Sequence, residues 1–251
     1  DAQGSAHKQA ADIEGLISQK PGVVLVVACD SDAILPSIKA LSDAGIKSIA
    51  YDVQFEDPNA LYITFDNVGV GRIIAREVSA AKPEGDFAII KGDKGDPNAT
   101  FLYNGMIEVL KPALDAGKIK IVCETFTDGW KPDNAQKNME QILTANNNAV
   151  DAVLSQNDGM AGGAAAALAA QGLNVPLGGQ DGDLAAAINR VALGTQTVSV
   201  WKNAKDLGKV AAEAANALAD GTAIDAVAGV KKFADGKNKV EMNAILLEPT
   251  P

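Results

Sequence analysis

The stretch VVLVVAC, residues Val23–Cys29, decides the fold class of this chain. It is continuously apolar and rich in β-branched valine, which is typical of a strand buried on both faces of a parallel sheet. Its length is that of a strand and is far too short for a membrane span. Six further runs of this kind follow along the chain, at Ser48–Tyr51, Leu61–Phe65, Phe87–Ile90, Ile119–Val122, Ala152–Ser155 and Thr197–Trp201.

Segments with helical periodicity separate most of these runs. Pro132 stands where a first helical turn tolerates proline. It is followed by apolar residues at the spacing of one helical face, namely Ala135, Met139, Ile142 and Leu143. The regular alternation of strands and helices predicts an α/β fold with parallel sheets flanked by helices.

The number of strands is too large for one small doubly wound domain, so we expect two Rossmann-like lobes. The N-terminal lobe is predicted to comprise residues 1–66 plus 202–236, and the C-terminal lobe residues 67–201 plus 237–251. A helix-like segment, His7–Ser18, precedes the first predicted strand. Because uncovered edge strands tend to aggregate, we expect the first sheet to have further strands upstream of Asp1, so that the N-terminal lobe is incomplete here.

Composition argues against several function classes. The chain has 22 Lys plus Arg and 32 Asp plus Glu, which gives a net charge of −10. Such an acidic protein repels phosphate backbones, so we expect no nucleic-acid partner and no insertion into a membrane. The single histidine, His7, lies in a polar helical context, and nothing places it beside Cys29 or Cys123 as a nucleophile–base pair. We therefore expect no enzymatic activity.

Cofactor and metal signals are weak. Gly69 and Gly71 lack the third glycine of a dinucleotide-binding loop. Asp181 and Asp183 alone are too few oxygen ligands for calcium, so neither a cofactor nor a metal is expected. The two cysteines form no CxxC pair and are interpreted as buried free thiols, with a disulfide as the open alternative.

The informative residues are polar side chains that follow the predicted strands. Ligands of open α/β sheets bind at the carboxyl ends of the strands. Carboxylates accept hydrogen bonds from hydroxyl groups, amides donate and accept, an ammonium group donates, and an indole covers the C–H face of a sugar ring. The set therefore favours a neutral polyol, although Asp and Asn at strand ends also cap helices. The candidates are Asp52, Asn98, Trp130, Asn157, Asp181 and Lys202.

Eight segments resemble, in order along nearly the whole chain, the periplasmic D-xylose-binding proteins of the type I periplasmic binding protein fold. They are Ala50–Asp52, Tyr62–Asn67, Val109–Pro112, Asp128–Pro132, Leu143–Asn148, Asn157–Asp158, Gly179–Asp181 and Gly194–Thr197. The resemblance implies two lobes joined by three crossings, with the sugar in the cleft between them. It implies that the six candidates above are the sugar-binding residues, with Trp130 as the stacking wall.

The resemblance also implies a function. The chain would bind a monosaccharide, a pentose and D-xylose first, and deliver it to the membrane permease and ATPase of an ABC importer. It would be periplasmic after removal of a signal peptide, or extracellular and lipid-anchored in a bacterium without an outer membrane. Two features depart from the family: Val53 stands where an arginine usually follows the aspartate, and the family's first strand, helix and second strand, with part of its C-terminal tail, are not in this sequence.

Three other functions remain open at this point. The same fold serves as the effector-binding core of sugar-responsive transcription repressors, although no basic or helix-turn-helix segment is present in this sequence. It also serves in sugar-sensing domains that dock on receptors of the histidine-kinase type. A sugar-modifying enzyme is the third alternative.

Overall fold

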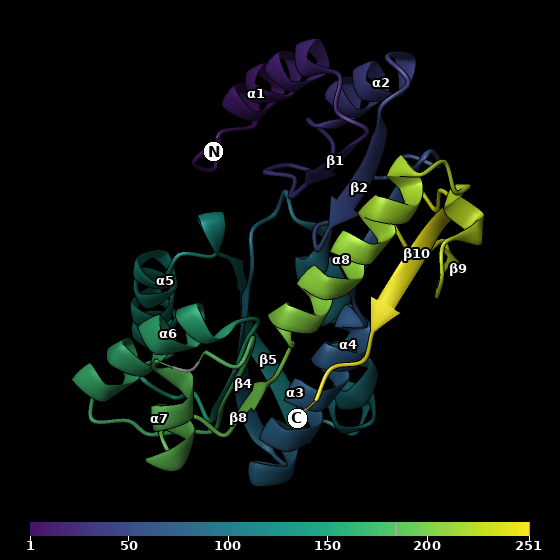
Figure 1. Cartoon of the computed structure of the whole chain (residues 1–251). Helices are drawn as coiled ribbons and strands as arrows, with labels where there is room; N and C mark the ends of the chain where they lie inside the picture. Colours follow the sequence, from purple (N-terminus) through teal and green to yellow (C-terminus); the bar gives the residue numbers. More distant parts are fainter. Residues whose placement is uncertain (184, 251) are drawn as a thin grey trace. The chain divides into compact units, whose positions relative to one another are not determined.

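The computed structural model describes residues 1–183 and 185–250, which divide into two compact units. Unit 1 consists of Asp1–Phe65, Gly95–Asn98 and Ala204–Leu247. Unit 2 consists of Asp66–Lys94, Ala99–Asn203 and the residues from Glu248 onward. Each unit is therefore assembled from separate stretches of the chain, and each has its own sheet (Figure 1).

Unit 1 is built on a five-stranded sheet with the order β1-β2-β3-β10-β9. All neighbours are parallel except β10 and β9. Its elements are α1 (Ala6–Gln19), β1 (Val23–Val26), α2 (Leu35–Asp43), β2 (Lys47–Tyr51), β3 (Ala60–Phe65), α8 (Ala204–Ala219), the 3-10 turn η2 (Ile224–Ala226), β9 (Lys231–Phe233) and β10 (Met242–Leu247).

Both faces of this sheet are buried, because successive side chains of a strand point to opposite sides. Ile49 and Ile63 pack with Leu207 of α8. Their neighbours Ala50 and Tyr62 pack on the other face, in the core that α1 and α2 cover. The continuous apolar runs in the sequence are therefore explained by a sheet between two helical layers.

The strand β1 forms one edge of this sheet within the described residues. Leu25 is 44% exposed and Val27, just beyond the strand, is 53% exposed. The expectation that further strands belong beside β1 stays a prediction.

The C-terminal part of the predicted lobe boundaries is wrong. Residues 237–251 were assigned to the second lobe, but Met242–Leu247 is β10, which pairs with β3 in unit 1. The chain returns to unit 2 after Leu247 rather than near Gly236. The stretch Gly95–Asn98 belongs to unit 1 and Lys202 to unit 2, each opposite to the prediction. Strand pairing is a non-local property, so the local apolar pattern does not reveal that β10 pairs with β3. The last residue of the predicted second lobe, residue 251, lies outside the described residues.

Unit 2 is built on a five-stranded, entirely parallel sheet with the order β5-β4-β6-β7-β8. Residues 97 and 98, with which helix α4 of this unit begins, are grouped with unit 1. The other residues of α4 belong to unit 2. Its elements are α3 (Asn67–Ala81), β4 (Gly85–Lys91), α4 (Pro97–Asp115), β5 (Ile119–Phe126), the 3-10 turn η1 (Asp128–Trp130), α5 (Pro132–Ala145), β6 (Ala152–Ser155), α6 (Asp158–Ala170), β7 (Leu177–Gln180), α7 (Ala187–Ala192) and β8 (Val198–Val200).

Helices cover both faces of this second sheet. Helices α3 and α4 pack on one face around Phe87 and Ile89, and α5 and α6 pack on the other around Ala88 and Ile90. The helix α5 begins at Pro132, as the sequence predicts. The predicted apolar stripe of α5 is confirmed, because its buried residues are Ala135, Met139, Ile142 and Leu143.

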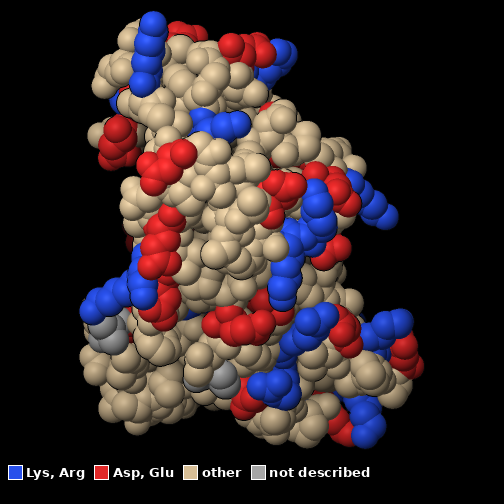
Figure 2. All heavy atoms as spheres, turned by 45° about the vertical axis from the view of Figure 1, so that its right-hand side comes forward, with Lys and Arg blue, Asp and Glu red and all other residues tan. Residues whose placement is uncertain are grey.

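The surface of the chain carries both kinds of charge. Lysine and arginine side chains are interspersed with aspartate and glutamate on the face drawn in Figure 2. No helix among residues 1–183 and 185–250 combines the length and the apolar character that crossing a membrane requires. Cys29 and Cys123 are free thiols, as expected, and each is partly rather than completely buried.

Candidate functional site

The carboxyl edge of the unit 2 sheet gathers four of the six predicted site residues. Trp130 lies after β5, Asn157 after β6, Asp181 after β7 and Lys202 after β8. The remaining strand, β4, ends next to Gly92. Because all five strands are parallel, their carboxyl ends meet at one edge, where open α/β sheets bind ligands.

The indole of Trp130 is seated on the backbone of Gly92. A Cβ atom added at Gly92 would run into the Cη2 and Cζ2 atoms of the ring. The backbone of Gly92 is itself fixed, because its N–H donates to Oε1 of Gln156 at 2.8 Å and its carbonyl accepts from the N–H of Thr127 at 3.1 Å. Trp130 packs against both cores of unit 2 and remains partly exposed, so part of the ring is available as a flat apolar wall.

Asn157 has the helix-capping role that was the alternative interpretation. It is the N-cap of α6, and its Oδ1 accepts a hydrogen bond from the N–H of Met160 at 2.8 Å. The cap uses only the amide oxygen. The Nδ2 group is the part of the side chain that can donate to a ligand.

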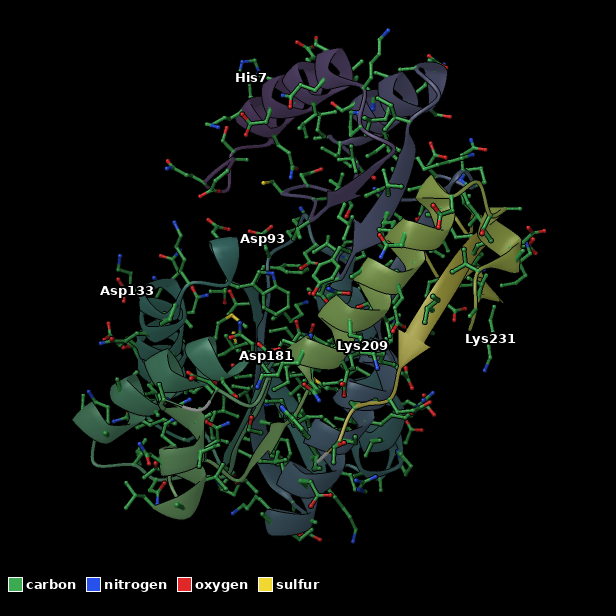
Figure 3. All side chains as sticks on the ribbon, in the orientation of Figure 1. His7, Asp93, Asp133, Asp181, Lys209 and Lys231 are labelled. Atoms are coloured by element: carbon green, nitrogen blue, oxygen red, sulfur yellow. The ribbon has the colours of Figure 1, made fainter. Side chains whose placement is uncertain are left out.

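Asp181 and Lys202 form a close pair of opposite charges. The Nζ atom of Lys202 lies 3.4 Å from Oδ1 of Asp181. The lysine side chain is only 11% exposed, whereas the side chain of Asp181, in the loop after β7 and labelled in Figure 3, is 46% exposed. An ammonium group beside a carboxylate offers a hydroxyl group both a donor and an acceptor.

Asp52 and Asn98 come together in unit 1. The Nδ2 group of Asn98 donates to the carbonyl of Asp52 at 3.2 Å, and Oδ1 of Asp52 accepts from the hydroxyl of Thr64 at 3.0 Å. Asn98 is 4% exposed and its N–H donates to Oδ1 of Asp96 at 2.9 Å. Burial, with a further contribution from the charge of Asp52, raises the pKa of the Tyr62 phenol well above its usual range, so this phenol stays neutral.

Three of the six predicted residues have a left-handed backbone. The φ angle is 63° at Asp52, 57° at Trp130 and 102° at Asp181. A residue with a side chain is strained in this region and keeps the conformation only where its surroundings over-determine it, which is common at binding sites. Local sequence gave no signal for this feature.

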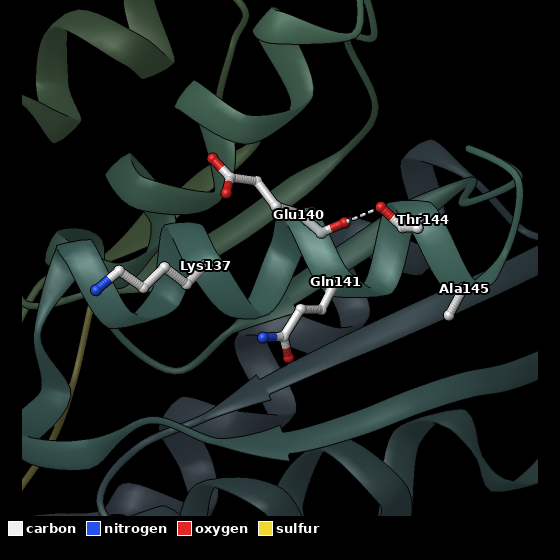
Figure 4. A pocket seen from close by; sticks show the side chains of 5 residues that line it. All are labelled: Lys137, Glu140, Gln141, Thr144 and Ala145. Carbon is white, nitrogen blue, oxygen red and sulfur yellow. Dashed lines mark hydrogen bonds between the residues drawn. The ribbon is translucent and has the colours of Figure 1, made fainter.

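Three other features of the chain do not add to the candidate site. Val53 is 7% exposed and packs in the unit 1 core, so the position of the family arginine holds an apolar side chain. Within the described residues, no group of three or more His, Cys, Asp or Glu side chains could hold a metal ion. A hollow of about 420 Å³ on the exposed face of α5 is lined by residues of that helix (Figure 4). Its lining residues are Lys137, Glu140, Gln141, Thr144 and Ala145.

Comparison with known proteins points to one family. A family described as periplasmic binding protein domain matches residues 1–223. The D-xylose-binding periplasmic protein of Escherichia coli is 42% identical over 223 residues, which cover 88% of this chain and 67% of that protein. The protein of the same name from Haemophilus influenzae is 39% identical, over 90% of this chain and 68% of its own length.

Solved structures agree with this assignment. An ABC transporter solute-binding protein from Clostridium phytofermentans with bound β-D-glucose has a TM-score of 0.85 at 28% identity, over 98% of this chain and 81% of that one. A carbohydrate transporter solute-binding protein from Chloroflexus aurantiacus, in complex with D-glucose, has a TM-score of 0.87 at 25% identity, over 98% and 80% of the two chains. The fold is that of the type I periplasmic binding proteins, and this chain belongs to the periplasmic binding protein family.

Proposed function

We propose that this chain binds a monosaccharide, with D-xylose as the first candidate, and delivers it to an ABC-type importer. The observation that carries the proposal is the arrangement at the carboxyl edge of the unit 2 sheet. There Asp181 and Lys202 present an acceptor and a donor 3.4 Å apart, and Trp130 presents a flat apolar ring. The names of the Escherichia coli and Haemophilus influenzae relatives support xylose in particular.

The chemistry of the site suits an uncharged sugar. The carboxylate of Asp181 accepts from hydroxyl groups, while Lys202 and the Nδ2 group of Asn157 donate to hydroxyl oxygens. The indole of Trp130 covers the C–H face of the ring. Asp52 and Asn98 of unit 1 stay predicted sugar-binding residues. Each hydrogen bond to a charged group is worth about 1.5–3 kcal/mol, so a sugar that lacks one hydroxyl or presents it on the wrong face binds more weakly.

The proposed partners are the permease and the ATPase of the importer, and the proposed location is the periplasm, or the outer surface with a lipid anchor in a bacterium without an outer membrane. Both follow from the relatives, which are named as periplasmic or as ABC transporter solute-binding proteins. The family consists of binding proteins, which favours transport over sugar conversion.

Calorimetric titration with xylose, ribose, arabinose, glucose and galactose tests the proposal. Two solute-binding proteins of similar structure were solved with glucose bound, so a hexose is the informative competitor. We expect xylose to bind most tightly and well below millimolar concentrations. If none of the five sugars binds more tightly than millimolar, the proposed function is wrong.

Substitution of site residues tests which groups hold the sugar. Asp181→Ala and Trp130→Ala should each weaken binding by about 10- to 100-fold, since each removes one strong contact worth about 1.4–2.8 kcal/mol. Asp133→Ala is the matched control, because Asp133 is an exposed carboxylate of unit 2 on the first turn of α5 (Figure 3). Thermal unfolding of each variant should show that the fold is retained. If Asp181→Ala and Trp130→Ala bind sugar with the same affinity as the wild-type chain and the control, neither residue belongs to the site.

A further inference from the structure

Asp158 is a buried carboxylate that is not among the six predicted site residues. It is 1% exposed and is the first residue of α6. Its Oδ1 accepts from the Nε2 group of Gln196 at 2.7 Å, and its Oδ2 accepts from the hydroxyl of Ser199 and from the N–H of Asp183 at 3.0 Å. Burying an ionised carboxylate is costly unless it is well hydrogen-bonded. Here three donors converge on Asp158, one from the loop after β7 and two from residues 196–199.

These contacts lead to the loop that carries Asp181. The N–H of Asp183 bonds Asp158 directly, and the N–H of Gly182 donates to the hydroxyl of Ser199 at 3.1 Å, which in turn donates to Asp158. The N–H of Asp181 itself donates to the carbonyl of β8 residue 200 at 2.8 Å. Three consecutive amides of this loop are therefore fixed, and two of them depend on Asp158.

The network is anchored on its other side by Arg190. Its Nε group donates to Oε1 of Gln196 at 2.9 Å, and its NH2 group donates to the carbonyl of Asp158 at 2.7 Å. The absence of a side chain at Gly179 makes room for the network, because a Cβ atom there would collide with Oδ1 of Asp158 and lie 2.8 Å from Nε2 of Gln196. The carboxylate is thus held from several sides and cannot easily reorient.

We propose that Asp158 is a positioning residue for sugar binding, which holds the 181–183 loop so that Asp181 keeps its left-handed backbone and its place beside Lys202. This inference rests on the proposed function, since it assigns Asp181 as a sugar ligand. A non-glycine residue in such a conformation costs about 1–3 kcal/mol and needs surrounding contacts to maintain it. At Asp181, φ is 102°, and the hydrogen bonds of the next two residues supply those contacts.

Four variants separate positioning from general stability. Asp158→Asn keeps the size of the side chain but places an NH₂ group against either Gln196 or the N–H of Asp183. Ser199→Ala removes the hydroxyl that links Asp158 to Gly182, and Ser199→Thr restores a hydroxyl at that position. Asp151→Asn is the matched control, because Asp151 also accepts a backbone N–H, from Asp86 at 2.9 Å, at the opposite end of the same sheet.

Two measurements are made on each variant: sugar affinity by calorimetry, and hydrogen exchange of the Gly182 and Asp183 amides by NMR without sugar. Asp158→Asn and Ser199→Ala should weaken binding at least about tenfold and speed exchange at both amides. Ser199→Thr and Asp151→Asn should keep the wild-type affinity. In an Asp181→Ala background, Asp158→Asn should cause little further loss of sugar affinity. The reason is that the effects of two substitutions do not add when one residue acts through the other.

The results that overturn the inference are equally definite. Wild-type affinity of Asp158→Asn, or a full additional loss in the Asp181→Ala background, shows that Asp158 does not act through Asp181. If Asp158→Asn fails to fold, the comparison of Ser199→Ala with Ser199→Thr decides, and equal affinities reject the inference. If the wild-type chain binds no sugar, the proposed function fails, and the exchange rates alone then show whether Asp158 orders the loop.

Discussion

At the scale of single residues, the position of Trp130 depends on a neighbour without a side chain. The indole occupies the space that a Cβ atom at Gly92 would need. The backbone of Gly92 lies outside the left-handed region, so alanine is compatible with its φ angle, and the three atoms nearest to an added Cβ all belong to the ring of Trp130. Gly92 is thus a determinant of the apolar wall, and its own backbone N–H and carbonyl are already hydrogen-bonded to Gln156 and Thr127.

Gly92→Ala should therefore displace the ring of Trp130 and weaken sugar binding by about tenfold, the equivalent of about 1.4 kcal/mol. The change is measured by calorimetry and by tryptophan emission in a Trp201→Phe background, where Trp130 is the remaining tryptophan. Gly15→Ala is the control, because a Cβ atom at that helical position meets nothing within 4 Å. That control should stabilise the chain by about 0.5–1 kcal/mol and leave affinity unchanged. Unaltered emission and affinity in Gly92→Ala would contradict this role.

At the scale of elements, the side chain of Asp151, which precedes β6, is hydrogen-bonded to the start of β4. Its Oδ2 accepts the N–H of Asp86 at 2.9 Å, and its Oδ1 lies 3.0 Å from Nζ of Lys82. The hydrogen bond from Asp86, and then the ammonium group of Lys82, lower the pKa of Asp151 below its usual value of 3.8. The ionised form is therefore the one that the folded state favours.

This lowered pKa gives the stability of the chain a pH dependence with a defined sign. Because the folded-state pKa lies below the unfolded value, the contribution is complete above about pH 4 and is lost as the pH falls through the folded-state pKa. Asp151→Asn should lower stability at pH 7 by less than about 1 kcal/mol, since the side chain is partly exposed to solvent. Urea unfolding at pH 7 and at pH 2.5 should show this difference shrinking in acid. A difference that is as large in acid as at neutral pH would mean that the charge has no part in it.

The limits of sequence reasoning also appear at the scale of elements. Apolar runs and helical spacing report burial of local segments, and they located β3, β6 and the buried stripe of α5. The rule that ligands meet the carboxyl ends of parallel strands selects Asp181 and Lys202 as strand-end residues, but the predicted lobe boundary at residue 202 puts them in different lobes, whereas both belong to unit 2. The roles of Gly92 and Asp158 depend on contacts with residues 38 positions further along the chain, Trp130 and Gln196, and no local pattern encodes such pairs.

At the scale of the whole molecule, the last strand determines how the chain is divided. The strand β10 lies between β3 and β9 and pairs with β3 from residue 243 to residue 247. Met242 and Ala244 are buried in the core with Tyr62, and Ile245 packs in the α8 core. Each large apolar side chain buried in this way contributes about 1.5–3 kcal/mol, a sizeable share of the total stability of about 5–15 kcal/mol typical of a domain. Unit 1 therefore requires a strand that the sequence alone assigned to the other lobe.

Truncation tests this requirement. A chain ending after Gly236 lacks β10 and should lose cooperative unfolding of unit 1, while unit 2 keeps its five strands. A chain ending after Leu247 retains β10 and loses the backbone pairing of Trp201 with Thr250, so both units should remain folded. Hydrogen exchange read by mass spectrometry should show β2 and β3 unprotected in the shorter chain and protected in the longer one, with β4 and β6 protected in both. Protection of β3 in the shorter chain would show that the parallel pairing with β10 is dispensable and that the predicted boundary near residue 236 is the better one.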